Sequence, residues 1–430
     1  MESARQSSNV TFDSSVRQKL NEILRTEHLR PASPADAVSG IQPQIVLEPT
    51  TEQQLAAALR LANESKLAVI PRGGGTKLGW GNPPSRGDII LSTTRLNKIL
   101  EHAWADLTVT VEAGCTVHTL QETLAQHGQR LALDPLWPEK ATVGGILSSN
   151  DSGGLRLRFG ALRDLIIGVT IALPDGTLAS SGGKVVKNVA GFDLPKLITG
   201  ALGTLGVITR AVFRLHPLPH GSRSFSIPAA NPDETQKLVL GVQDSKLAHV
   251  ALQSHFSADL PPSTDILFEG TAAGLDAQSS QLRALCHSAQ ISEASPSTWN
   301  ARQELWSISN PEETAIAKIS TLPTDLAHTL ELFRRSANSA HLTWKSLMYA
   351  TGLGWLRLEG RPDDLHRALT TLRFDIEKMG GSLVLLHRPA MHLPFEAWGT
   401  PGDSLPLMKA VKHQLDPANT LNPGRFLGGI

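Results

Sequence analysis

Cysteine is scarce in this sequence of 430 residues. Only Cys115 and Cys286 occur, one in each half of the chain. Two thiols cannot complete a cysteine-ligated iron–sulfur cluster, which takes about four, so any such cluster would belong to another chain. Few cysteines are also typical of a reducing compartment, where disulfides are rare.

An excess of one charge and long apolar runs are lacking as well. Forty basic residues balance forty acidic ones, and no run of five or more basic residues occurs, so the footprint of a nucleic-acid binder is missing. No window reaches the roughly 18 apolar residues of a membrane span, and "MESARQSSNVTFDSSVRQKL" lacks the apolar core of a signal peptide. We therefore expect a soluble, cytoplasmic protein that would reach the inner membrane only through partners.

Glycine, in contrast, is present in clusters. The stretch "PRGGGTKLGWG" (71–81) has three successive glycines, each roughly 0.5–1 kcal/mol less favourable than alanine inside a helix or strand. Bare backbone N–H groups form a cradle for phosphate. The stretch has neither the Gly-Lys-Ser/Thr ending of a P-loop nor the helix that follows a Rossmann fingerprint. Taken alone, it is equally compatible with a tight structural turn.

A second stretch, "DPLWPEKATVGGILSSNDSGG" (134–154), also concentrates small donors and bare backbone. These are Thr142, Gly144, Gly145, Ser148, Ser149, Asn150, Ser152 and Gly153. Two remote loops of this kind fit an extended ligand with a central pyrophosphate, so a dinucleotide is favoured over a simple turn. Farther along, Gly200, Gly203 and Gly206 allow close backbone approach, either to an aromatic ring system or to another element.

Strand and helix patterns predict two α+β units. Residues 1–39 form a lead-in helix and linker, and 40–220 form the first unit. The composition shifts near "HPLPHGSRS", after which 221–400 alternates strands and helices in the manner of a second α+β domain. Residues 401–430 contain a helix that stops at Asp416, before a proline, and then a turn-rich terminus.

Local patterns within the first unit are more specific. Residues 88–92 and 107–114 are predicted strands, and 116–128 is a helix ended by glycine. Thr50 followed by Gln53 predicts a capping box at the start of an earlier helix.

Together these motifs resemble the FAD-binding domain of the vanillyl-alcohol oxidase type, also called the p-cresol methylhydroxylase (PCMH) fold. "PRGGGT", "TVGG…SGG", "KNVAGFDL…L…GTLGVIT" and "DPANTLNPGRF" match it in order and spacing, over about 40–220 and 400–430. More narrowly, "KVVKNVAGFDLPKLITGALGTLG" and "ATVGGILSSNDSGGLRLRFGALRDLIIGVT" resemble E subunits of bacterial glycolate oxidase, or glycolate dehydrogenase. The resemblance implies an α+β fold with a two-subdomain PCMH-type FAD-binding domain, an antiparallel α+β cap domain (221–400), and a C-terminal return (401–430) to the FAD domain.

The resemblance also implies an FAD site. Its loops would surround the pyrophosphate and ribityl chain, the "GVI" backbone would meet the adenine, Asn188 and Asp193 would brace the flavin pocket, and Asn422 would approach the ring. The implied cofactor-binding residues are Pro71, Arg72, Gly73, Gly74, Gly75, Thr76, Gly79, Pro135, Thr142, Gly144, Gly145, Ser148, Ser149, Gly153, Gly206, Val207, Ile208 and Asn422. Relatives with covalent flavin often carry a histidine in or just after the glycine loop. Thr76 and Lys77 stand there instead, so we expect noncovalent FAD.

Catalytic residues are harder to place. Oxidising a 2-hydroxy acid requires a base and a cation or metal for the carboxylate, and relatives use a His-x-Gly-Asp-Gly-Asn signature that is missing here, so no metal site is expected. The nearest candidates are His387 as base and Arg388 as carboxylate clamp, with His392 beside them. The alternative, which we favour, is a strand end with both side chains on a surface or in a subunit contact.

Two lysines and one leucine bear on the same question. Lys184 and Lys187 lie in a glycine-rich loop, where solvated lysines are the simpler interpretation. Leu202 stands where catalytic relatives commonly place a glutamate, which favours an auxiliary flavin subunit.

The resemblance therefore implies an FAD subunit of a multi-subunit glycolate dehydrogenase. It would work beside a D-type flavin subunit and an F-type iron–sulfur subunit in oxidising glycolate to glyoxylate. Two alternatives remain open: a self-sufficient FAD oxidoreductase of another hydroxy acid or alcohol, and an assembly scaffold that has kept the FAD fold.

Overall fold

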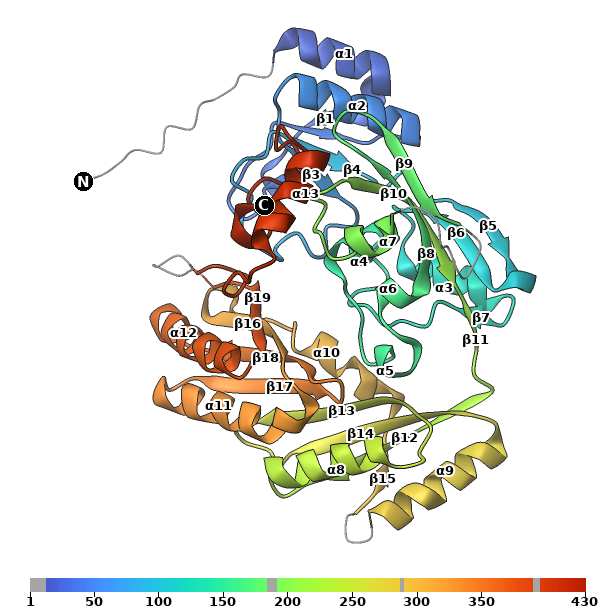
Figure 1. Cartoon of the computed structure of the whole chain (residues 1–430), viewed down its shortest axis with the longest axis vertical. Helices are drawn as coiled ribbons and strands as arrows, with labels where there is room; N and C mark the ends of the chain where they lie inside the picture. Colours follow the sequence, from blue (N-terminus) through green and yellow to red (C-terminus); the bar gives the residue numbers. More distant parts are fainter. Residues whose placement is uncertain (1–12, 184–191, 287–289, 390–394) are drawn as a thin grey trace.

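The computed structural model describes residues 13–183, 192–286, 290–389 and 395–430. Figure 1 shows two bodies, with the N-terminal half and the C-terminal helix in one and the segment between them in the other. The predicted α+β class is confirmed. The sequence-based domain bounds, including 40–220 and 221–400, stay predictions.

The first body begins with a four-stranded sheet of order β1-β2-β4-β3, in which β2, β4 and β3 are parallel. Its apolar strands and two amphipathic helices share one core, as parallel strands usually do because helices cover them. The elements are α1 Ser14–Leu24, β1 Leu29–Pro31, β2 Ile45–Leu47, α2 Glu52–Glu64, β3 Val69–Arg72 and β4 Ile89–Ser92.

The start of α2 corrects one detail of the sequence analysis. Thr51, not Thr50, is the N-cap, and its side chain accepts from the backbone N–H of Gln54 at 3.1 Å. Thr50 instead donates from its backbone N–H to the Gln54 side chain at 2.9 Å. The predicted pair was therefore wrong by one residue, because Thr51 is the last residue with extended backbone.

A five-stranded antiparallel sheet of order β5-β6-β10-β8-β9 completes the first body. Alternating burial along β10 turns its apolar face onto the helices. The elements are β5 Ile99–Ala103, β6 Thr108–Glu112, α3 Val117–Ala125, α4 Val143–Ser149, α5 Arg156–Phe159, α6 Leu162–Leu165, β8 Ile166–Ala172, β9 Leu178–Gly182, α7 Leu194–Ile198 and β10 Val207–Arg214; β7 Gln129–Arg130 pairs with β11 His216–Pro217.

The second body is an eight-stranded antiparallel sheet of order β15-β12-β14-β13-β17-β18-β16-β19. Helices α8, α9, α11 and α12 cover its outer face and form its main core. The elements are β12 Gly221–Pro228, α8 Pro232–Asp244, β13 His249–Ser257, β14 Ser263–Gly270, α9 Ala272–Leu285, β15 Ser292–Glu293, α10 Ala301–Glu304, β16 Thr314–Ser320, α11 Leu326–Ser339, β17 Thr343–Tyr349, β18 Leu353–Glu359, α12 Pro362–Lys378 and β19 Ser382–His387. This body is hereafter called the cap.

The inner face of the cap sheet packs against the first body. Trp80 and Leu136 of the first body share an apolar cluster with cap residues such as Trp355, Leu347 and Ile316. The two bodies are thus joined by a continuous buried contact rather than by linkers alone.

The chain then returns to the first body. Helix α13 (Leu405–Leu415) precedes a tail in which Leu421 bridges Val69 of β3. The buried ammonium of Lys412 donates to the carbonyls of Thr204 and Leu421 at 2.8 and 3.0 Å, and pairs with Asp416 at 2.5 Å. Short 3₁₀ turns lie at Thr26–His28, Pro34–Asp36, Trp104–Asp106, Pro296–Asn300, Pro311–Glu313, Pro323–Asp325 and Leu427–Gly429.

Candidate functional site

The two glycine-rich loops lie directly against each other. A Cβ on Gly73 would lie 2.0 Å from Oγ1 of Thr142, and one on Gly74 would lie 1.7 Å from the carbonyl oxygen of Lys140. Real Cβ atoms do not approach so closely, so both positions require glycine. The close contact brings the backbone of 72–76 alongside the start of α4.

Thr142 organises the second loop. Its side chain accepts from the backbone N–H of Gly145 at 3.2 Å and caps α4. Ser149, one turn later, donates to the carbonyl of Gly145 at 2.7 Å.

The C-terminal tail and the segment before β10 form the third wall. Leu202 and Gly203 have φ values of 50° and 69°, a left-handed region that a leucine adopts only when its surroundings enforce it. The Asn422 side chain donates to the carbonyl of Leu202 at 2.6 Å, and its backbone N–H donates to Val69 at 2.9 Å. The tail therefore fixes the strained turn against β3.

These three walls enclose one cleft, which contains most of the predicted residues. Lining it are Pro71, Arg72, Gly73, Gly74, Gly75, Thr76, Thr142, Gly144, Gly145, Ser148, Ser149, Gly206, Val207, Ile208 and Asn422 from the prediction, together with Lys77, Leu78, Thr93, Leu202, Gly203 and Arg425. An elongated ligand with a diphosphate suits this lining, because two glycine loops and two arginines converge on it.

Three predicted residues lie outside the cleft lining. Gly79 has open space where a Cβ would be. Gly153 donates its N–H to Asp134 at 3.0 Å, so that amide is already used. Pro135 is next to Leu136, which packs beneath the cap.

Residues 43–182 match the family model described as "FAD binding domain". The chain contains an FAD binding domain. It is similar to the glycolate oxidase subunit GlcD of Bacillus subtilis, with 26% identity and 89% of each chain covered. A D-lactate dehydrogenase of Archaeoglobus fulgidus is 33% identical over 49% of this chain and 46% of its own length.

Solved structures show the fold to be of the p-cresol methylhydroxylase type. A p-cresol methylhydroxylase superposes with a TM-score of 0.75 and 15% identity, covering 96% of each chain. Alkyldihydroxyacetonephosphate synthase superposes with a TM-score of 0.73 and 16% identity, covering 96% of this chain and 86% of its own. These structures show the fold alone. The FAD binding domain and the similar hydroxy-acid-oxidising proteins make the chain an FAD-dependent oxidoreductase.

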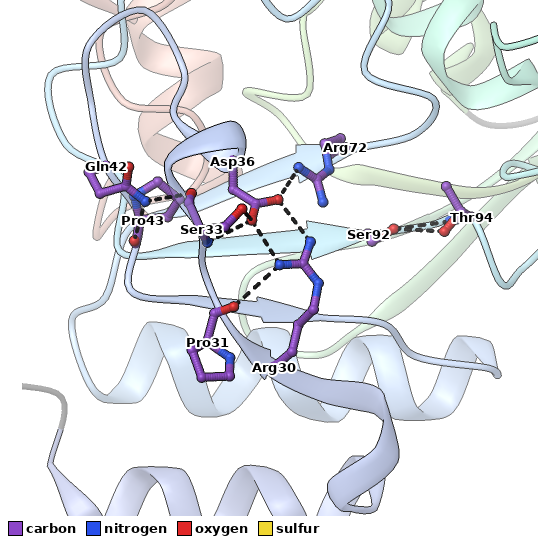
Figure 2. A network of polar contacts seen from close by, with 9 residues as sticks. All are labelled: Arg30, Pro31, Ser33, Asp36, Gln42, Pro43, Arg72, Ser92 and Thr94. Atoms are coloured by element: carbon purple, nitrogen blue, oxygen red, sulfur yellow. Dashed lines mark hydrogen bonds and ion pairs between the residues drawn. The ribbon is translucent and has the colours of Figure 1, made fainter.

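A carboxylate behind the FAD binding domain's glycine loop holds Arg72 in place. Asp36, which is buried, accepts from Arg72 at 2.7 Å and from Arg30 through two bonds of 2.8 Å. Figure 2 shows both guanidinium groups converging on this carboxylate, with Ser33 beside them. Arg30 above all, helped by Ser33 and Arg72, holds the pKa of Asp36 far below its ordinary value.

Replacing Asp36 with asparagine is expected to lower the free energy of unfolding by about 2 kcal/mol at pH 7, because two arginines lose a charged partner. A carboxyl with a depressed pKa stabilises the fold above its unfolded pKa of about 4 and loses that effect as the pH falls. In urea denaturation the difference in stability between the parent and the variant should therefore shrink progressively as the pH falls below 4. Equal stability at pH 7 would contradict this role.

A buried ionic cluster joins the glycine loop of the FAD binding domain to the cap. Asp151 accepts from Lys77 at 3.1 Å and from Arg302 of α10 at 2.8 Å, and all three side chains are at most 6% exposed. Although burial alone would raise it, Arg302 and Lys77 hold the pKa of Asp151 below its usual value. Arg302 also lies over the ring of Trp355, 5.0 Å from the centroid.

The sequence analysis missed two further cations beside this cluster. Lys318 on β16 faces the first body, paired in register with Trp355, and Arg156 lies close enough to repel it. Within the described ranges neither side chain has an ion pair. Burial first, and Arg156 second, lower the pKa of Lys318 to about 8.

The predicted catalytic pair does not line the cleft. His387 bonds through Nε2 to the carbonyl of Pro311 at 3.1 Å, and burial lowers its pKa. Arg388 donates to the carbonyl of Gly81 at 3.3 Å, which ties the cap to the glycine loop. Both side chains therefore make contacts within the chain and away from the cleft, and a catalytic role for either stays untested.

The remaining predicted positions divide in two. Asp193 caps α7 and pairs with Lys196 at 3.0 Å on an exposed surface. Lys184, Lys187, Asn188 and His392 lie outside the described residues.

Within those described ranges, no cluster of three or more His, Cys, Asp or Glu side chains is arranged to hold a metal. Among the helices of the same residues, none is both long and apolar enough to span a membrane.

Proposed function

We propose that this chain is an FAD-carrying subunit of a 2-hydroxy-acid dehydrogenase, with glycolate as substrate and glyoxylate as product. FAD supplies the acceptor for the two electrons removed from the substrate. The observation that carries the proposal is a row of charged side chains that begins at the FAD cleft with Lys77 and Asp151 and ends at Lys318 and Arg156, two cations without an ion pair in the described chain. A similar protein is named a glycolate oxidase subunit, and another a D-2-hydroxyglutarate dehydrogenase at 26% identity over 89% of each chain.

In the proposed complex the glycine loop and α4 hold the FAD diphosphate noncovalently. Residues 73–76 line the cleft, and the backbone N–H groups of such a run of small residues form a nest that binds anions. The described residues that line the cleft include no histidine, the residue that relatives with covalent flavin often carry in or just after the glycine loop.

Lys318 and Arg156 are proposed to bind the substrate carboxylate. Two cations that lack an ion pair in the described chain favour an anion between them, and a carboxylate satisfies a guanidinium through two parallel bonds. Apolar Trp355 and buried Tyr349 line the same sheet face, which would exclude water from the C2 carbon.

The chain is further proposed to be auxiliary, beside a D-type flavin subunit and an F-type iron–sulfur subunit. The described residues that line the cleft include no histidine, aspartate or glutamate that could act as a general base. The two cysteines cannot hold an iron–sulfur cluster, so electrons would leave through a partner. Lys318 and Arg156 favour a second candidate, in which this chain alone oxidises a hydroxy acid.

Mixing the protein with substrate under anaerobic conditions distinguishes an auxiliary subunit from a self-sufficient enzyme. The purified holoprotein is mixed with glycolate or D-lactate, alone and then with its D and F partners, while the flavin absorbance is followed. The auxiliary role predicts little bleaching by the isolated chain and rapid bleaching with partners. Rapid bleaching of the isolated chain would establish the self-sufficient enzyme instead, and no bleaching in either sample would contradict hydroxy-acid oxidation.

Changing Lys318 to methionine is expected to weaken binding of oxalate, a non-oxidisable carboxylate, by about 30-fold at pH 7, or about 2 kcal/mol. Because the pKa of Lys318 is about 8, the ammonium is charged below that pH. The parent protein should lose oxalate affinity by up to about tenfold per pH unit above pH 8, and the variant should not. Titration calorimetry measures both.

Lys345 on β17 provides the control, since it is exposed on the same sheet. Lys345→Met should bind oxalate as the parent does. If Lys318→Met and Lys345→Met bound oxalate equally well, Lys318 would not be the carboxylate site.

A further inference from the structure

Three cationic side chains line the FAD cleft, and their charge compensation differs. Arg72 pairs with Asp36 at 2.7 Å, as Figure 2 shows, and Lys77 pairs with Asp151 at 3.1 Å. Each therefore reaches the cleft with a buried carboxylate as its ion-pair partner. The third cation, Arg425 of the C-terminal tail, is different.

Arg425 is 3% exposed, yet no carboxylate of the described residues lies within ion-pair distance of it. One nitrogen, Nη2, donates to the carbonyls of Leu78 and Trp80 at 2.5 and 2.6 Å. The Nε nitrogen is buried and has no hydrogen-bond partner among the residues that the structure describes. Burial alone lowers the pKa of Arg425 to about 10, so the guanidinium stays charged at neutral pH.

The contacts to the glycine loop do not explain the charge. Two carbonyls require only N–H donors, which a neutral amide also supplies. An uncompensated buried charge is strongly unfavourable, and it is tolerated where a ligand brings the opposite charge. The guanidinium is also the side chain best suited to forked bonding with an oxyanion.

We propose that Arg425 is the counter-ion of a negative charge carried by the bound cofactor. This rests on the proposed function in one respect only, that the cleft is where FAD binds. FAD offers two anionic partners to such a group: the diphosphate, which is always charged, and the ring, which gains negative charge on reduction. In either case Arg425 would contact both the loop carbonyls at 78 and 80 and the cofactor, and so link the C-terminal tail to the FAD site.

The test uses the full chain stripped of FAD and reconstituted. Arg425→Met removes the charge at similar length, and Arg425→Lys keeps it without the fork. Arg373 is the control, because it is a half-buried arginine of the cap that donates to the carbonyl of Ala397 and lies outside the cleft lining. The readouts are the Kd for FAD, the Kd for ADP, and the midpoint potential of the bound flavin.

Arg425→Met is expected to weaken FAD binding on the order of 10- to 100-fold, whereas Arg373→Met should match the parent within about threefold. A parallel loss of ADP affinity assigns the partner as the diphosphate. If ADP binding is unchanged and the midpoint potential falls, by about 30 mV for each tenfold loss of affinity for the reduced relative to the oxidised form, the partner is the ring.

Unchanged FAD affinity together with an unchanged potential in folded Arg425→Met would overturn the proposal. If Arg425→Met does not fold, Arg425→Lys serves as the test. This variant is expected to bind FAD about three- to tenfold more weakly than the parent. FAD affinity and midpoint potential equal to those of the parent would overturn the proposal. A parent chain that binds no FAD would instead refute the cofactor site itself, which separates the two failures.

Discussion

Gly74→Ala is expected to weaken FAD binding on the order of 100-fold or more, equal to about 3 kcal/mol. The added Cβ would lie 1.7 Å from the carbonyl oxygen of Lys140, and a backbone oxygen cannot move aside as a flexible side chain can. The two loops must therefore separate, and the polar groups that line the cleft on each loop no longer converge on one diphosphate. Quenching of FAD fluorescence on titration with apoprotein measures the loss.

Gly79→Ala is the matched control within the same loop. A Cβ at Gly79 meets nothing within 4 Å, and this residue does not line the cleft. Its FAD affinity should stay within about twofold of the parent, while thermal unfolding of both apoproteins shows whether each is folded. If folded Gly74→Ala still bound FAD tightly, the proposal that the glycine loops form the FAD site would be wrong.

The second large effect is expected at Asp151. Asp151→Asn should lower the free energy of unfolding by about 3–5 kcal/mol, because it leaves the buried cations Lys77 and Arg302 without their shared carboxylate. Since Lys77 belongs to the glycine loop and Arg302 to the cap, the variant should also loosen the contact between the two bodies. Denaturant unfolding and limited proteolysis measure the two consequences.

Asp276 gives the comparison for this variant. It pairs with Arg223 at 2.7 Å but is 68% exposed, so Asp276→Asn should cost less than about 1 kcal/mol. A double-mutant cycle of Asp151→Asn with Arg302→Met should show a coupling of about 1–3 kcal/mol. If Asp151→Asn cost no more than Asp276→Asn, the ionic cluster would not hold the cap in place.

Much of the architecture could be predicted from local sequence patterns. The strand at 88–92 and the helix at 116–128 are present as β4 Ile89–Ser92 and α3 Val117–Ala125, because alternation, capping residues and terminal glycines act over a few residues. The order of the eight strands in the cap sheet could not be predicted from the sequence. Strand pairing joins segments far apart in the chain, and no local signal specifies which partner each edge takes.

Part of the cleft lining could be predicted from the sequence for the same reason. Clustered glycines mark positions where backbone must be bare, so most predicted residues line the cleft. Asp36, Lys318 and Arg425 gave no sign in the sequence, since a single charged residue resembles any solvated one. Their significance comes from burial and from the presence or absence of an opposite charge, which only the folded chain reveals.

Leu202 is informative both for its side chain and for its backbone conformation. The sequence analysis noted it as a leucine in place of a glutamate, which favours an auxiliary subunit. In the structure it is also a left-handed residue whose carbonyl is held by Asn422. Assignment as an E-type rather than a D-type subunit rests on motifs of this region and stays a proposal, while the similar protein named above is a D subunit.

The central claim is that two distant, glycine-rich loops bind a single FAD diphosphate. A crystal structure of the chain with FAD bound tests it most directly. The account predicts phosphate oxygens within hydrogen-bond distance of the backbone nitrogens of 73–76 and of the Ser148 hydroxyl on α4, which lines the same cleft. A diphosphate bound elsewhere, with these amides facing solvent, would contradict it.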